Sequence, residues 1–151
     1  MAKTTPKTIG WREWVALPDL GVSEIKAKID TGADNSALHA FNIVRFDKAG
    51  VPHVRFDLHP RQRKRTPTIP CEAEVVMERK VRNPGGRTEL RPVIRTRMVV
   101  AGTELDALVN LTTRDKMTFR LLLGRRTLRE GFVIDPSRSY IGPRPARMDT
   151  A

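Results

Sequence analysis

Alternation of apolar and polar residues is the dominant pattern along the chain, and it predicts strands rather than helices. At 25–29 three apolar residues alternate with two lysines, which is the two-residue period of a strand with one buried face. Similar alternation, or a short apolar run, predicts strands at 10–18, 41–46, 54–58, 72–81, 93–101, 104–111, 119–123 and 132–134. A helical period occurs at 127–130, just before Gly131. Many short strands with frequent turns and one short C-terminal helix predict a mainly β protein, folded as a small closed barrel.

Turn signals group several of these strands into hairpins. Residues 47–50 separate 41–46 from 54–58, and a proline with two glycines at 84–86 separates 72–81 from 93–101. The second hairpin is long and strongly basic, with cations at Arg79, Lys80, Arg82, Arg87 and Arg91.

The length of 151 residues predicts one domain that buries a core without disulfides. We expect this domain at 10–142, between a flexible N-terminus at 1–9 and a flexible tail at 143–151. There is no run of eighteen apolar residues and no signal-peptide core, so we expect a cytoplasmic protein that does not enter a membrane. Cys71 is the only cysteine, which fits a reducing compartment.

Charge narrows the range of partners. The chain has 28 Lys and Arg against 17 Asp and Glu, a net charge of +11. Such a field attracts nucleic acid, the ribosome, an anionic membrane surface or an acidic peptide, although it also suits a protein that is merely soluble. The loop at 59–67 holds four cations among five consecutive residues, 61–65. This loop is either a solvated connection or a landing site for an acidic partner.

The strand at 25–29 runs directly into Asp30, Thr31 and Gly32, followed by Ala33. A carboxylate at a strand end, followed by a glycine and small residues, is open to a substrate or to a second chain. A surface turn capped by the Asp is the alternative reading. The unit resembles the active-site loop of aspartic peptidases, and 30–34 is close to the retroviral type. The apolar strand 119–123, which ends in Gly124 and Arg125, stands at the position expected for the second element of that fold.

Several longer segments extend the resemblance over 10–142. They are Asp-Thr-Gly-Ala at 30–33, Ser-Ala-Leu-His-Ala at 36–40, Glu-Leu-Arg-Pro-Val-Ile at 89–94, Arg-Asp-Lys-Met at 114–117, Leu-Leu-Gly-Arg-Arg at 122–126 and Val-Ile-Asp-Pro-Ser-Arg-Ser-Tyr at 133–140. These segments resemble the ATP-dependent zinc protease family, whose members are RimK-associated and retropepsin-like. The resemblance implies a retropepsin-like barrel and a hydrolase of the aspartic peptidase type.

The resemblance also implies how such a site would act. A retropepsin needs two carboxylates that share a proton, and this chain has one Asp-Thr-Gly, so the second Asp30 would come from another copy in a homodimer. Thr31 would brace the two loops and Gly32 would leave room for water. The basic hairpin is either a flap over the cleft or an ordinary barrel hairpin. The expected substrate-binding residues are Ala33, Arg79, Arg82, Gly85, Gly86, Arg87, Arg91 and Arg125.

The sequence offers little support for a zinc site or an ATP site. The chain lacks a His-Glu-x-x-His motif, paired cysteines and a phosphate-binding Gly-rich loop. His39, His53, His59 and Cys71 are the only soft ligands, at spacings that match no standard zinc site. We therefore expect no metal site and no cofactor, with zinc held by some of these four residues as the less favoured alternative.

RimK-type ligases add glutamates to the end of a ribosomal protein, and the resemblance implies hydrolysis of such acidic, glutamate-rich tails. The cations of the basic hairpin and of the loop at 61–65 agree with a polyglutamylated substrate and with ribosome association. The alternative is a non-catalytic basic barrel that binds the ribosome, RNA or an acidic protein. A retropepsin-like endopeptidase with apolar specificity is a second enzymatic alternative.

Overall fold

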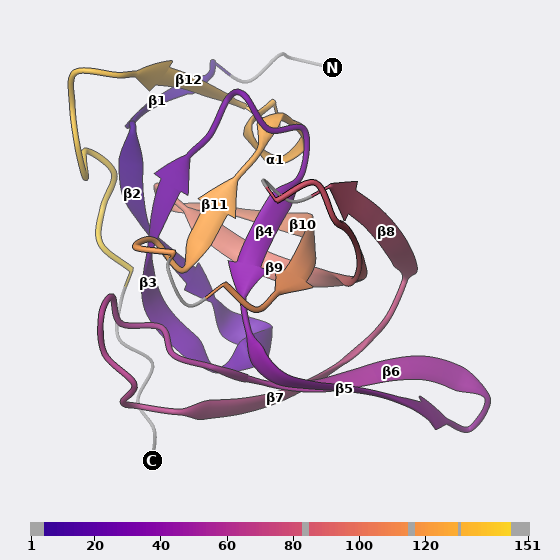
Figure 1. Ribbon diagram of the computed structural model, residues 1–151. Helices are drawn as coiled ribbons and strands as arrows, with labels where there is room; N and C mark the ends of the chain where they lie inside the picture. Colours follow the sequence, from indigo (N-terminus) through magenta and orange to yellow (C-terminus); the bar gives the residue numbers. More distant parts are fainter. Residues whose placement is uncertain (1–4, 83–84, 115–116, 130, 146–151) are drawn as a thin grey trace.

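The computed structural model describes residues 5–82, 85–114, 117–129 and 131–145. Six strands form a closed ring in the order β10–β4–β11–β3–β2–β9, and β9 pairs back onto β10 (Figure 1). The closed β-barrel predicted from the alternation is therefore confirmed. Its strands are β2 (Arg12–Leu17), β3 (Val22–Ile29), β4 (Ser36–His39), β9 (Thr88–Val100), β10 (Thr103–Thr112) and β11 (Leu121–Leu123).

The barrel interior is filled by one face of each strand. In β3 the apolar residues Ile25, Ala27 and Ile29 are buried, whereas the intervening Lys28 is exposed. Leu38, Met98, Val109 and Leu121 add further buried side chains from the other strands to the same core. Burial of apolar surface of this kind is the main stabilising term of a small domain, and it fixes the register of each strand.

The remaining elements surround the barrel. Strands β5 (Phe41–Lys48), β6 (Val51–Leu58) and β7 (Ile69–Glu74) form a separate sheet, from which the β5–β6 hairpin projects away from the barrel (Figure 1). Strand β8 (Met77–Arg82) pairs with β9, and β1 (Lys7–Gly10) pairs in parallel with β12 (Phe132–Asp135). A 3₁₀ turn, η1 (Pro18–Leu20), links β2 to β3, and the described residues contain one α-helix, α1 (Arg125–Leu128).

The long hairpin predicted from 72–81 and 93–101 forms only in part. Residues up to Glu74 belong to β7 and pair with β6, whereas β8 alone pairs with β9. The hydrogen-bonding partner changes between two consecutive residues: Val75 N donates to Pro52 O at 2.9 Å, whereas Val76 N donates to Val93 O at 2.9 Å. The prediction was wrong here because an alternating pattern carries no signal for which neighbouring strand will accept its hydrogen bonds.

The N-terminal strand β1 and the C-terminal segment are both hydrogen-bonded to the rest of the domain. Lys7–Gly10, which lie partly in the segment expected to be flexible, form β1. The Glu13 carboxylate is 1% exposed and accepts three backbone N–H groups, from Gly10 at 2.7 Å, Ile141 at 3.1 Å and Gly142 at 3.0 Å. This one side chain therefore ties β1 and the C-terminal segment to β2. No helix in the described ranges is long and apolar enough to cross a membrane.

Candidate active site

Asp30 lies directly after β3, on a tight turn. Its N–H donates to Leu123 O at 2.9 Å, which extends the pairing of β3 with β11 by one residue. The chain then reverses, because Ala33 N donates to Asp30 O at 3.2 Å. Gly32 N donates to Asp30 Oδ1 at 3.1 Å, so the carboxylate is oriented by its own turn. Asp30 is only partly buried, and Thr31 and Gly32 are exposed, so the turn is open to a substrate or a second chain.

The Asp30 turn packs tightly against the end of β11. A Cβ placed on Gly124 would lie 2.4 Å from Asn35 O and 2.6 Å from Asn35 C, so only glycine allows the two segments to approach this closely. The Ser36 hydroxyl accepts the Gly124 N–H at 3.0 Å and lies 2.6 Å from Thr127 Oγ1, and all three residues are buried. The turn that carries Asp30 is thereby fixed to β11 and α1, which lie about ninety residues later in the sequence.

Two arginines at the start of α1 hold the same turn from outside. Arg125 donates through Nη1 to Thr31 O at 2.9 Å and through its backbone N to Ala33 O at 2.8 Å. Arg126 Nε donates to Asp34 Oδ2 at 3.1 Å, so the other carboxylate of the turn is engaged in an ion pair. Arg125, expected to bind substrate, is exposed beside Asp30, and its contacts in the structure are with the turn itself.

Arg91 departs from the role expected for it. Its side chain is buried, 5% exposed, and does not belong to an outward-facing set of hairpin cations. Arg91 Nη1 donates to Asn110 Oδ1 at 3.1 Å, Nε bonds Glu89 at 3.1 Å, and Asn110 Nδ2 donates to Ser36 O at 3.0 Å. Arg91 therefore links the base of the basic hairpin to the strand that follows the Asp30 turn.

The other hairpin residues keep an outward position. Arg82, Arg87, Gly85 and Gly86 are exposed, and Gly86 has the positive φ of +82° that its turn requires. Arg79 is partly buried on β8, and Asn83 and Pro84 of the predicted turn lie outside the described residues. A cationic surface on this hairpin is thus present, without Arg91.

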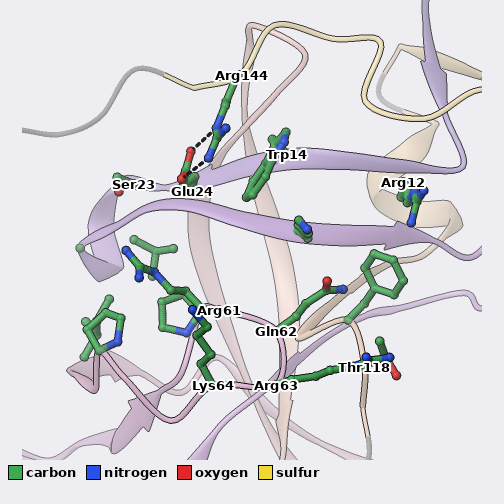
Figure 2. Close-up of a pocket in the computed structure, with 17 residues that line it drawn as sticks. Arg12, Trp14, Ser23, Glu24, Arg61, Gln62, Arg63, Lys64, Thr118 and Arg144 are labelled. Atoms are coloured by element: carbon green, nitrogen blue, oxygen red, sulfur yellow. Dashed lines mark hydrogen bonds and ion pairs between the residues drawn. The ribbon is translucent and has the colours of Figure 1, made fainter.

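The basic loop at 61–65 does not join the hairpin. It borders a cleft of about 700 Å³ beside β2 and β3, and none of the hairpin cations line that cleft (Figure 2). Six cationic side chains line it against one acid, Glu24, which is paired with Arg144 at 2.6 Å. These cations are Arg12, Lys26, Arg61, Arg63, Lys64 and Arg144. Within the described residues the hairpin cations and the loop cations therefore lie in separate basic regions, and we call the region around the loop the β2–β3 cleft.

Trp14 forms the aromatic wall of the β2–β3 cleft. Lys26 Nζ lies 5.3 Å and Arg144 Cζ 4.3 Å from the centre of its ring, both within range of cation–π attraction, and Tyr140 packs beside it at 5.8 Å. Trp11 packs against Phe119 in the same region. Both tryptophans are half-buried, so they cover the outer side of the barrel wall rather than fill its core.

The four candidate soft ligands do not come together: His39 and His59 line one cavity, whereas His53 and Cys71 each lie in a different part of the fold. No group of three or more His, Cys, Asp or Glu residues suited to a metal ion occurs in the part of the chain that the structure describes. His39 lies at the end of β4 opposite the Asp30 turn, where its Nδ1 accepts the Arg114 N–H at 3.1 Å. Burial raises the pKa of the Cys71 thiol to about 11, with the Asp57 charge as a smaller cause, so the thiolate that binds metals is scarce near neutral pH.

Sequence reasoning missed the residues that hold the Asp30 turn in place. Ser36, Asn110 and Thr127 are buried polar residues joined in one hydrogen-bonded group. A signal for one of them exists, because Asn110 interrupts the apolar run from Ala107 to Leu111. A polar residue at a core position is retained only where it finds a partner.

Comparison with known families matches residues 8–145 to the RimB-like family, described as "Retropepsin-like aspartic endopeptidase RimB". The chain belongs to this retropepsin-like family. Membership agrees with the closed barrel and with the aspartate turn at the end of β3.

Relatives of the chain include longer proteins. Two proteins named "Probable alpha-L-glutamate ligase", from Shewanella pealeana and Desulfotalea psychrophila, are 42% and 39% identical over 132 and 131 residues. The matched part covers 87% of this chain but only 29% and 28% of those proteins. A crystal structure of a Legionella pneumophila protein of unknown function has a TM-score of 0.75 and 31% identity, over 89% of this chain and 97% of that one. This chain therefore spans less than a third of the length of these two relatives.

Proposed function

We propose that this RimB-like chain is an aspartic peptidase that hydrolyses acidic, glutamate-rich protein tails through a pair of Asp30 residues in a homodimer. The observation that carries the proposal is the Asp30 turn. Its carboxylate is oriented by the Gly32 N–H, open to solvent, and presented at the end of a barrel strand in a retropepsin-like family.

Two Asp30 carboxylates about 3 Å apart would share one proton. One would take a proton from the attacking water while the other gives a proton to the carbonyl oxygen of the peptide bond, without a covalent intermediate. The exposed Thr31 and Gly32 support a meeting of two turns, since neither presents a bulky side chain to a partner copy. The mechanism requires neither zinc nor ATP, so a chelator should leave hydrolysis unchanged.

The preference for acidic substrates rests on charge and on the relatives. Arg125 and Arg126 flank the turn, Arg82 and Arg87 extend from the hairpin, and the β2–β3 cleft holds six more cations. A chain of glutamates would neutralise these charges, and the gain would fall as added salt screens them. The names of the ligase relatives support a link to glutamate addition, with a glutamylated ribosomal protein as one such substrate.

The test compares Asp30→Asn with a matched control, Asp106→Asn, whose carboxylate is exposed and makes no hydrogen bond or ion pair within the described residues. Hydrolysis of oligoglutamate-tailed and neutral peptides would be measured at two salt concentrations, with sedimentation to report the oligomer. We expect the D30N variant to lose activity while remaining a dimer, and the D106N variant to keep it. If D30N retained activity, or if the active enzyme were a monomer, catalysis by a pair of Asp30 carboxylates would be refuted.

The second candidate is a non-catalytic module that binds acidic proteins or RNA. The large, basic β2–β3 cleft supports it, because a binding role for the cleft does not require catalysis at Asp30. In that case wild-type protein would bind an acidic tail without cleaving it, and D30N would bind equally well. The same peptides therefore separate the two functions.

A further inference from the structure

A second cavity, of about 350 Å³, lies at the end of β11 away from the Asp30 turn. Arg120 precedes β11 and Gly124 follows it, so the two sites are roughly 13 Å apart along the strand. The cavity wall brings together side chains from separate segments of the chain: His39, Phe41, His59, Arg65, Thr113 and Arg120. The position of Arg120 is fixed by pairing with β4, since its carbonyl oxygen accepts the His39 N–H at 2.8 Å.

Arg120 is the unusual member of this wall. It is 7% exposed, and its Nε is buried without any hydrogen-bond partner among the described residues. An arginine stays charged inside a protein, and a buried N–H group that has no acceptor is unfavourable. Among the described residues, the other buried Glu or Arg side chains are Glu13 and Arg91. Glu13 is satisfied by three backbone N–H groups, and Arg91 by Glu89 and Asn110.

Two imidazole rings and a hydroxyl complete the polar part of the wall. Because His39 Nδ1 accepts the Arg114 N–H, the neutral ring carries its proton on Nε2. Thr68 Oγ1 donates to Arg65 O at 3.3 Å and therefore accepts from His59 Nε2, 3.2 Å away, so this N–H orients the His59 ring and is not directed at a ligand. The Phe41 ring packs 3.9 Å from that of His59 and holds it in place. None of the six wall residues is an acid, and two are arginines.

We propose that this cavity binds a small oxyanion, a carboxylate or a phosphate group, with one oxygen accepting the Arg120 Nε–H and Arg65 adding the second positive charge. The volume lies at the lower end of the range of small-molecule sites, which suits a dicarboxylate or a phosphate rather than a folded partner. The site is independent of the proposed peptidase activity, because it lies at the other end of β11 and uses none of the residues of the Asp30 turn.

The test is calorimetric titration of the wild-type protein with glutarate and, separately, with inorganic phosphate, at a constant ionic strength set by chloride. We expect saturable binding of at least one of them, with one site per chain. Glutarate binding identifies a carboxylate site and phosphate binding a phosphate site, and either result supports the proposal. Loss of one charged hydrogen bond predicts that Arg120→Met weakens binding about tenfold or more. Arg65→Gln should weaken it less.

The matched control is Arg95→Gln, which removes an exposed cation of β9 that lines neither this cavity nor the β2–β3 cleft. It should bind the anion like the wild type. In anion-free buffer we also expect R120M to melt no lower than the wild type, since the substitution removes a buried N–H group that has no acceptor. The proposal is overturned if neither anion binds saturably, if R120M binds as tightly as the wild type, or if R120M fails to fold.

Discussion

Removing the Ser36 hydroxyl would weaken the packing of the Asp30 turn against β11 and α1 without changing Asp30 itself. Ser36 is 1% exposed and bonds both Gly124 N, at 3.0 Å, and Thr127 Oγ1, at 2.6 Å. Ser36→Ala removes both bonds and leaves the Gly124 N–H buried with no acceptor. An unpaired buried donor costs about 1–3 kcal/mol, and the second lost bond adds about 1 kcal/mol. We therefore expect the free energy of unfolding to fall by about 2–4 kcal/mol.

The measurement is urea unfolding followed by tryptophan fluorescence, supported by thermal melting. A loss of this size lowers the melting temperature of a 150-residue domain by about 5–12 °C. Thr127→Val removes only the second bond, so we expect a loss of about 1 kcal/mol. Because both substitutions delete the same Ser36–Thr127 bond, the double variant should cost about 1 kcal/mol less than the sum of the singles.

The matched control is Ser23→Ala on β3, a partly exposed serine whose hydroxyl makes no hydrogen bond within the described residues. Its unfolding free energy should stay within about 0.5 kcal/mol of the wild type. If Ser36→Ala behaves like Ser23→Ala, the hydroxyl does not hold the turn and the reasoning fails. A coupling energy near zero between positions 36 and 127 would refute the hydrogen bond between them.

Three further predictions concern other contacts of the fold. Gly124→Ala would place a methyl group 2.4 Å from Asn35 O, so we expect a loss of at least about 1–3 kcal/mol in urea unfolding. Glu13→Ala would leave three backbone N–H groups without their acceptor and should lower stability by about 3–5 kcal/mol. The raised pKa of Cys71, about 11, predicts slow alkylation by iodoacetamide at pH 7, with a rate that rises tenfold per pH unit until it levels off near that value.

Each of these has a clear contrary result. A Gly124→Ala variant as stable as the wild type would mean that the turn and β11 can separate at little cost. If Glu13→Gln and Glu13→Ala were equally stable, the carboxylate oxygens would not be the acceptors that hold the C-terminal segment. An alkylation rate at Cys71 that levels off below pH 9 would contradict burial of the thiol.

The sequence alone determined those features of the chain that depend on neighbours along it. Alternation over 25–29 predicts β3, and the small residues after Asp30 predict the turn, because strand period and turn chemistry act over a few residues. The number and spacing of such strands were enough to predict a closed barrel, since short alternating strands must bury one face together.

Only the tertiary structure decided what those local units contact. The buried position of Arg91 depends on its hydrogen bond to Asn110. The position of the Asp30 turn depends on close packing against Gly124 and on the bond between Ser36 and Thr127, and these partners are distant in the sequence. Likewise the basic loop at 61–65 packs beside β2 and β3 rather than under the hairpin. Local sequence patterns do not predict such pairings, because a buried polar contact stabilises the fold only when both partners are removed from water and placed next to each other.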